Sequence, residues 1–163
     1  LLLKMRIRHS ALLIFVAILF FSCDKKRVFD EYKSVGRAWH KDSVVSFDLP
    51  ELDSTKRYNL FVTLRDNNNY PFNNLFLIVG LEMPNGFTKV DTLEYQMANP
   101  DGSLMGDGFS DIKENKLFYK EKVRFRGKYK VNIKQAVRET GKVPGVTALD
   151  GITEVGFRIE NTD

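Results

Sequence analysis

The chain has one cysteine, Cys23, and the residues ahead of it decide which chemistry its thiol is available for. Residues 11–21 form an uninterrupted apolar stretch, and Ser22, a small residue, separates that stretch from the cysteine. A basic region, an apolar region and a small residue in this order are typical of a secretory signal. The stretch is also shorter than the roughly 20 residues that span a membrane. We therefore predict that residues 1–22 are a signal peptide that is removed. The basic residues of this region are Lys4, Arg6 and Arg8.

A small residue followed by cysteine after an apolar stretch resembles the lipobox of bacterial lipoproteins. In such proteins the thiol receives a diacylglyceryl group and the chain is cut in front of the cysteine. The usual leucine three positions before the cysteine is replaced here by Phe20. We expect Cys23 to carry lipid, residues 23–27 to form a short tether, and no other cofactor to be present. The alternative is that Cys23 lies inside an apolar helix that is not cleaved.

Removal of the signal changes which partners and reactions the composition allows. It takes away three of the 25 basic residues and none of the 21 acidic ones, so the formal net charge falls from +4 to +1. Recognition of nucleic acid, which needs a basic domain, loses its support. His40 becomes the only histidine, which excludes a Cys–His pair and a zinc site of several His and Cys ligands. An enzyme with this composition would have to rely on carboxylates for catalysis. We expect that the protein is not an enzyme.

Apolar residues alternate with polar ones along most of the remaining chain, and clusters of Gly, Pro, Asn and Asp separate the alternating segments. Period-two alternation predicts antiparallel strands with one wet face. We predict an all-β fold: a single antiparallel β-sandwich over residues 28–163, jelly-roll-like, with about eight strands. The residues expected to face inward are Val45, Phe47 and Leu49; Tyr58, Leu60, Val62 and Leu64; Leu93, Tyr95 and Met97; Tyr119, Val123 and Phe125; Tyr129, Val131 and Ile133; and Val155, Phe157 and Ile159.

Two segments depart from this alternation. Residues 74–81 are apolar at nearly every position, which predicts a central strand covered on both faces. Residues 134–139 are expected to form one helical turn.

Three aspartates in a glycine-rich segment are weak candidates for a calcium site. Asp101, Asp107 and Asp111 could supply oxygen ligands, but their spacing does not match that of an EF-hand loop. Asp and Gly also form turns without any metal. We therefore expect no metal and keep the three residues as candidates only.

Three aromatic residues are candidates for an interaction surface. Tyr70 and Phe72 lie in a segment rich in asparagine, and Trp39 precedes His40. Exposed aromatic rings at the edge of a sandwich could stack on sugars, so a glycan-binding lipoprotein is the alternative function. The competing interpretation is that the rings fold back over the sheet ends. A hydrolase with two carboxylates is a further alternative, but no pair is singled out.

The order of several longer segments resembles one known family. The most distinctive part runs from Tyr58 to Leu75 and contains YNLFV, LR, YP and NL; further on stand DTLEYQMANPDGSLMGDGFSDI, FRGKYKVNIKQAVRE and LDGITEVGFRIE. In this order, behind a lipoprotein signal, they are similar to the gliding-motility lipoprotein H family (GldH) of the Bacteroidetes. The resemblance covers about Val28 to Glu160. One departure is the segment Ser103–Leu104–Met105, where relatives often have an aromatic or bulky residue.

The resemblance implies a non-enzymatic lipoprotein required for gliding, which acts as a scaffold or assembly component of the machinery that moves surface adhesins. Its implied partners are membrane lipid, through the anchor, and other gliding or envelope proteins, with no small-molecule substrate. Cys23 is the only residue whose role is carried over. Because basic residues 25–27 follow Asp24, where exported lipoproteins of this phylum tend to be acidic, we expect the periplasmic face of the outer membrane, with the inner membrane as second choice.

Overall fold

The computed structural model describes residues 24–162, so the predicted signal peptide and Cys23 lie outside the described residues. Within the described range the secondary structure is all β, and no helix there is long and apolar enough to cross a membrane. The strands are β1 (Arg27–Ser34), β2 (Ala38–His40), β3 (Val45–Asp48), β4 (Tyr58–Asp66), β5 (Asn74–Glu82), β6 (Thr88–Gln96), β7 (Lys113–Val123), β8 (Lys130–Gln135), β9 (Ala148–Asp150) and β10 (Ile152–Asn161).

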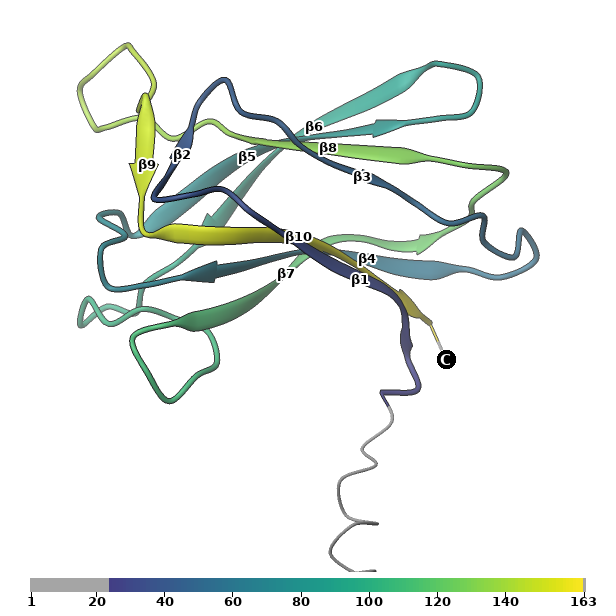
Figure 1. Cartoon of the computed structure of the whole chain (residues 1–163), viewed down its shortest axis with the longest axis horizontal. Helices are drawn as coiled ribbons and strands as arrows, with labels where there is room; N and C mark the ends of the chain where they lie inside the picture. Colours follow the sequence, from purple (N-terminus) through teal and green to yellow (C-terminus); the bar gives the residue numbers. More distant parts are fainter. Residues whose placement is uncertain (1–23, 163) are drawn as a thin grey trace, which may run out of the picture.

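The strands form two four-stranded sheets and a short ribbon (Figure 1). The first sheet has the order β1-β10-β4-β7, the second sheet has the order β3-β8-β5-β6, and the ribbon consists of β2 and β9. All pairs are antiparallel. The pairing is nested: β5 pairs with β6, β4 with β7, β3 with β8, β2 with β9 and β1 with β10. A long hairpin rolled up in this way is the jelly roll, so the fold prediction is confirmed.

The core lies between the inner faces of the two sheets, as the alternation predicted. Leu93, Tyr95, Val123 and Tyr129 are half-buried at its margin, and the other residues predicted to face inward are buried. Full burial of one side chain of this size contributes roughly 1.5–3 kcal/mol. The ribbon adds Trp39 and Leu149, which face each other across it and are fully buried.

Three details differ from the prediction. Eight strands form the two main sheets, and seven of them contain a segment that the sequence predicted; β1 was not among these segments, and the ribbon brings the count among the described residues to ten. β5 is central, but Phe76 and Ile78 on its outer face are only half-buried, because no element packs on that side. The predicted helical turn at 134–139 is wrong: β8 continues to Gln135, whose side chain accepts a hydrogen bond from Val137 N, and Arg138 forms a bridge with Gly145.

Side chains close the two sides where edge strands of the sheets meet. Lys33 of β1 donates to the Ser46 carbonyl oxygen of β3 at 2.5 Å. On the other side Asp91 of β6 accepts a hydrogen bond from Tyr119 at 2.8 Å and pairs with Lys120 at 2.9 Å. Charged side chains at sheet edges oppose pairing with further strands, and these contacts lie at such edges.

Gly151 provides a test of how tightly the chain packs between β9 and β10. Its φ is +86°, and a Cβ there would lie 2.2 Å from Tyr70 N. Gly141 has a similar φ of +80° but open space around it. We expect Gly151→Ala to lower the free energy of unfolding by about 3–5 kcal/mol, from backbone strain and overpacking together. Gly141→Ala should cost only the strain, about 1–2 kcal/mol. Equal losses in urea titrations would contradict the close packing.

Candidate interaction surfaces

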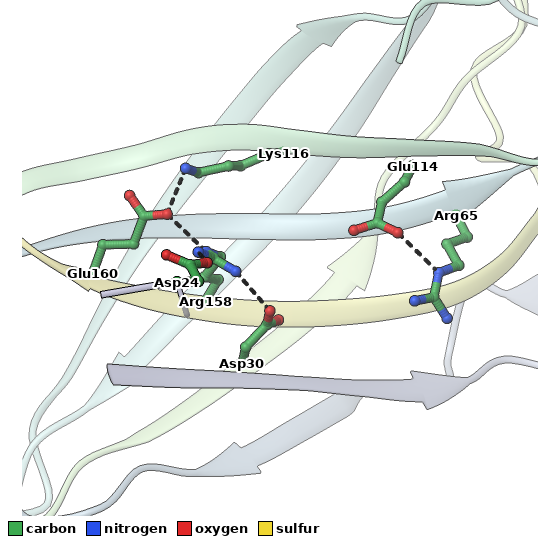
Figure 2. Close-up of polar contacts among 7 residues, drawn as sticks. All are labelled: Asp24, Asp30, Arg65, Glu114, Lys116, Arg158 and Glu160. Carbon is green, nitrogen blue, oxygen red and sulfur yellow. Dashed lines mark hydrogen bonds and ion pairs between the residues drawn. The ribbon is translucent and has the colours of Figure 1, made fainter. Parts of the chain in front are cut away.

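A cluster of charged residues around Arg158 occupies the outer face of the first sheet (Figure 2). Arg158 Nη1 donates to Asp30 Oδ2 at 2.8 Å, and Arg158 Nε donates to Glu160 Oε1 at 2.7 Å. Its Nη2 donates to the carboxylate of Asp24. Lys116 of β7 donates to Glu160 Oε1 at 2.5 Å. This Arg158 cluster therefore joins β1, β10 and β7 across the sheet and attaches the chain ahead of β1 to it.

Two carboxylates of this cluster, those of Glu160 and Asp24, have a pKa below the usual value. Burial alone would raise the pKa of Glu160, but hydrogen bonds and charges from Lys116 and Arg158 outweigh it and keep the pKa below its usual value. The hydrogen bond from Arg158 likewise lowers the pKa of Asp24. A glycosidase needs one carboxylic acid with a raised pKa. The Arg158 cluster is thus a structural ion network, and its arrangement does not fit a carboxylate-dependent hydrolase.

Arg65 organises the other half of this face in the same manner. Its Nη1 donates to Glu154 Oε2 at 2.6 Å, its Nε lies 3.4 Å from Glu114 Oε2, and its guanidinium stacks 4.2 Å from the centre of the Tyr32 ring. The space under that ring exists because residue 156 is glycine: a Cβ there would lie 3.0 Å from Tyr32 Cδ1. The cations on this face are therefore already matched by partners from the same chain.

Asp66 is the described carboxyl group whose environment resembles that of a catalytic acid. It is fully buried at the end of β4, and burial raises its pKa to about 6 although Asn115 Nδ2 donates to its Oδ1 at 2.9 Å. Its Oδ2 has no hydrogen-bond partner. Because no solvent reaches the group, a substrate could not reach it either. Asp66 and Asn115 instead join β4 to β7.

The sandwich has two unlike ends, which we name by the chain segments they contain (Figure 1). The N-terminal end, on the right of the figure, is where β1 begins; it contains the loops 49–57, 83–87 and 124–129. The far end, on the left, contains the loops 67–73, 97–112 and 136–147.

Two of the three aromatic candidates do not form an interaction surface: Trp39 and Tyr70 lie in the core, as the competing interpretation predicted. Trp39 is 0% exposed and its Nε1 donates to the Ser43 carbonyl at 3.0 Å. Tyr70 is 5% exposed and its hydroxyl donates to the Asn74 carbonyl at 2.5 Å. Both rings complete the core, since the ends of a sandwich need apolar lids whose polar atoms still find partners. Phe72 is half-buried, and it lines a groove.

That groove lies at the far end and has a volume of about 1050 Å³. Phe72 and Phe76 contribute apolar surface to it. Its remaining lining is mostly polar and comes from the loops 67–73, 97–112 and 136–147 and from the adjoining strands β5 and β6, with Asn73, Asn74, Asn99, Asp101 and Arg138 among the residues.

The three aspartates of the calcium candidate serve the local structure of their loop. Asp101 Oδ1 accepts hydrogen bonds from the backbone and side chain of Ser103, at 2.9 and 2.6 Å. Asp107 exchanges backbone hydrogen bonds with Glu114. Across the described residues, 24–162, no group of three or more His, Cys, Asp or Glu side chains comes close enough together to hold a metal ion. The aspartates are therefore not gathered into a site.

Exposed apolar side chains at the far end were missed by the sequence analysis. In loop 97–112 Phe109 is fully exposed, and Ile112 and Met105 are partly exposed. In loop 136–147 Val143 is 84% exposed. The available signal was an apolar residue within a run of Gly, Asp and Ser, as in GDGFSD. A contiguous exposed apolar patch often marks a contact with another protein, whereas single exposed apolar side chains are common on protein surfaces.

The Arg158 cluster leads to a prediction on stability. Replacement of Arg158 by Met leaves Asp30 without a cation, and leaves Glu160 with Lys116 alone, in a largely buried place. We expect a loss of about 2–4 kcal/mol in the free energy of unfolding. Arg158→Lys should restore only part, because one ammonium group cannot contact three carboxylates. Lys142→Met, which breaks an exposed pair with Glu139, is the control and should cost under about 1 kcal/mol. Similar losses for both Met variants in urea unfolding would refute the cluster's role.

Asp66 leads to a prediction on pH dependence. Its folded pKa of about 6 exceeds the ordinary value of 3.8, so ionised Asp66 weakens the fold above pH 6 by about 3 kcal/mol. Asp66→Asn keeps the shape and should raise the free energy of unfolding at pH 7 by up to that amount. The gain should shrink as the pH falls from 6 to 4, because wild-type Asp66 then becomes neutral. Asp101→Asn, at an exposed site, should show no such gain; its appearance there would speak against the assignment.

Comparison with known proteins finds relatives that match nearly the full length of the chain. The family described as GldH lipoprotein matches residues 27–159. The gliding motility lipoprotein GldH of Flavobacterium johnsoniae is 79% identical over 159 residues, which cover 98% of this chain and 100% of that protein. A protein described as a gliding motility lipoprotein GldH homolog, from Christiangramia forsetii, is 57% identical over 152 residues, 92% of this chain and 93% of its own. The chain therefore belongs to the GldH lipoprotein family.

Proposed function

We propose that the protein is a lipid-anchored, non-enzymatic component of the cell envelope that is required for gliding motility. It acts as a scaffold or assembly component of the machinery that moves surface adhesins. The observation that carries this proposal is the 79% identity, over essentially the whole of both chains, to a protein named for gliding motility and for its lipid.

The attachment of the N-terminal segment supports a scaffold that is held close to its membrane. Asp24, the residue after the proposed lipidated Cys23, is bound to Arg158, and Lys26 O accepts a hydrogen bond from Asn161 N at 2.8 Å. The chain ahead of β1 is therefore fastened to the sandwich rather than free to extend. An acyl anchor on Cys23 would place the N-terminal end next to the bilayer.

The far end then faces away from that bilayer and is the proposed contact surface for other gliding or envelope proteins. Phe109 and Val143 project there from two different loops, and their burial against a partner would remove a large apolar area from water. We propose the periplasmic face of the outer membrane as the location, since basic residues 25–27 follow Asp24 in place of the acidic run expected for export.

Glycan binding is the second candidate, and the far-end groove is the observation that favours it. Phe72 offers part of a ring there, and neighbouring amide groups could bond to sugar hydroxyls. Calorimetry of the purified protein with envelope oligosaccharides tests this idea. A heat of binding that disappears in a Phe72→Ala variant would favour glycan binding, and the absence of a heat of binding in the wild-type protein would contradict it.

The scaffold proposal predicts that charged residues at the far end abolish gliding without unfolding the protein. We expect Phe109→Asp combined with Val143→Asp to stop cell movement in a gliding relative that lacks its own copy. The amount of protein in membranes and its melting temperature should stay unchanged, because both side chains are exposed.

Val44→Asp with Val90→Asp is the matched control, since these residues are 53% and 61% exposed on the outer face of the second sheet. Cells with the control pair should still glide. Protease added to intact cells should leave the protein whole if it faces the periplasm. Normal gliding with the far-end pair, or loss with the control pair only, would contradict the proposed contact surface.

A further inference from the structure

The N-terminal end gathers segments that are far apart in the sequence. Asn161 N donates to Lys26 O, and Thr162 Oγ1 donates to Arg57 O in loop 49–57. Asn59 Oδ1 accepts a hydrogen bond from Lys122 N at 3.1 Å, which places the end of β7 beside β4. These contacts make the start of β1, the end of β10, loop 49–57 and the end of β7 one continuous surface.

Loop 124–129 and turn 83–87 extend the same surface. A Cβ on Gly127 would lie 3.0 Å from Pro84 Cγ, and Leu49 N donates to Tyr129 O at 2.9 Å. Phe87, in the same turn as Pro84, is 61% exposed. The N-terminal end therefore also carries an exposed aromatic ring.

Positive charge dominates this surface. Nine exposed basic residues lie there, and within the described range none of them has an ion-pair partner: Lys25, Lys26, Arg27, Lys56, Arg57, Lys122, Arg124, Arg126 and Lys128. The exposed acidic residues of the same end are Asp24, Asp48, Glu51, Asp53 and Glu121; Asp24 pairs with Arg158, and Asp48 pairs with Lys130. The loops of the far end have the opposite balance, with Arg138 and Lys142 against Asp101, Asp107, Asp111 and Glu139.

The backbone at Lys122 adds a second, independent observation. Its φ is +54°, the one positive value of a non-glycine residue among those described. A left-handed conformation is uncommon for such residues and is often retained for a functional reason. Here it occurs in the sequence KEKVRFRGKYK, where Lys122, Arg124, Arg126 and Lys128 are exposed and Phe125 between them is buried.

We propose that this N-terminal end docks onto the anionic head groups of the membrane that holds the anchor. The inference rests on the proposed lipid anchor, and it adds an oriented, electrostatic contact to it. A lipid on Cys23 would lie one residue from Asp24, about 4 Å at most between Cα atoms, so Lys25, Lys26 and Arg27 would stay near the bilayer, on the scale of a Debye length. Basic residues at that distance are attracted to anionic lipid, and Phe87 provides an apolar side chain for the interface.

Docking fixes the orientation of the sandwich. The strands then run roughly perpendicular to the membrane surface. The far end lies about 30 Å from the head groups, which is roughly the length of a nine- or ten-residue strand. A single flexible anchor would leave that distance undefined.

The sharpest test uses fluorescent labels on the lipidated, mature protein in vesicles. Cys23 is the only cysteine, so once it carries lipid an engineered thiol can be labelled alone. Ser54→Cys places a label at the N-terminal end and Val143→Cys places one at the far end. In vesicles with about a third phosphatidylglycerol, a lipid-borne quencher should reduce the Ser54 signal severalfold more than the Val143 signal. The difference should fall in phosphatidylcholine vesicles and at high salt.

Charge reversal provides the matched control. A variant with Lys122, Arg124, Arg126 and Lys128 each replaced by Glu should lose the difference in quenching. Each lost positive charge lowers the equilibrium constant for docking about fivefold. A second variant with Arg37, Lys41, Arg138 and Lys142 replaced by Glu has the same change in net charge and should keep it. Unchanged melting temperatures confirm that both variants are folded.

The outcomes separate docking from anchoring. Equal quenching at both labels, or equal effects of the two charge-reversed variants, overturns the docking proposal. Vesicle flotation is read in the same samples: protein that floats without preferential quenching at Ser54 keeps its anchor but does not dock. Protein that fails to float contradicts the lipid anchor itself, and with it the proposed function on which docking rests.

Discussion

Nested antiparallel pairing is the constraint on which the other features of this molecule depend. Each strand pairs with the one that lies symmetrically opposite in the chain, from β5 with β6 at the closed end of the hairpin to β1 with β10 at its open end. Two consequences follow. Both termini meet at one end of the sandwich, and the loops of alternate connections gather at each end. Since the chain after Cys23 enters at β1, the rolled hairpin determines which loops lie next to a lipid anchor and which lie away from it.

The charged residues on the outer face of the first sheet serve this architecture. Arg158 sits on β10 between β1 and β4, so one guanidinium can bind carboxylates from β1, from its own strand and from the segment ahead of β1. Arg65 occupies an equivalent position nearer the far end. A face whose cations are already paired has little left to offer a ligand. The candidate contacts therefore lie at the two ends of the sandwich, where loops are free to differ in composition.

The two ends differ in the physical chemistry of their side chains. Unpaired lysines and arginines dominate the N-terminal end, whereas exposed apolar residues and a polar groove mark the far end. Electrostatic attraction to a charged surface acts over about 10 Å and needs no shape complementarity, which suits a lipid bilayer. Apolar side chains on loops gain free energy only by close packing, which suits a protein. A sandwich with this polarity could hold a partner at a defined height above a membrane.

The sequence alone predicted seven of the ten described strands and the faces that they bury, because alternation with period two is a local property that each segment carries without reference to the others. Val155, Phe157 and Ile159 are buried as that pattern predicted. The signal and Cys23 are likewise local motifs, and their assignment stays a prediction. The burial of Trp39 and Tyr70 could not be established from their neighbours in the sequence. A ring in a polar segment is compatible both with a position over the core and with an exposed surface.

Which distant residues contact each other or share a surface follows only from the tertiary structure. Asp24 and Arg158 are 134 positions apart, and the basic surface at the N-terminal end draws its charges from three separate segments of the chain. Counted along the sequence, those charges cancel against acidic residues elsewhere to leave the predicted mature chain at +1. Folding separates them in space, because the rolled hairpin sends the connections that contain lysine and arginine to one end and most of the aspartate-containing loops to the other.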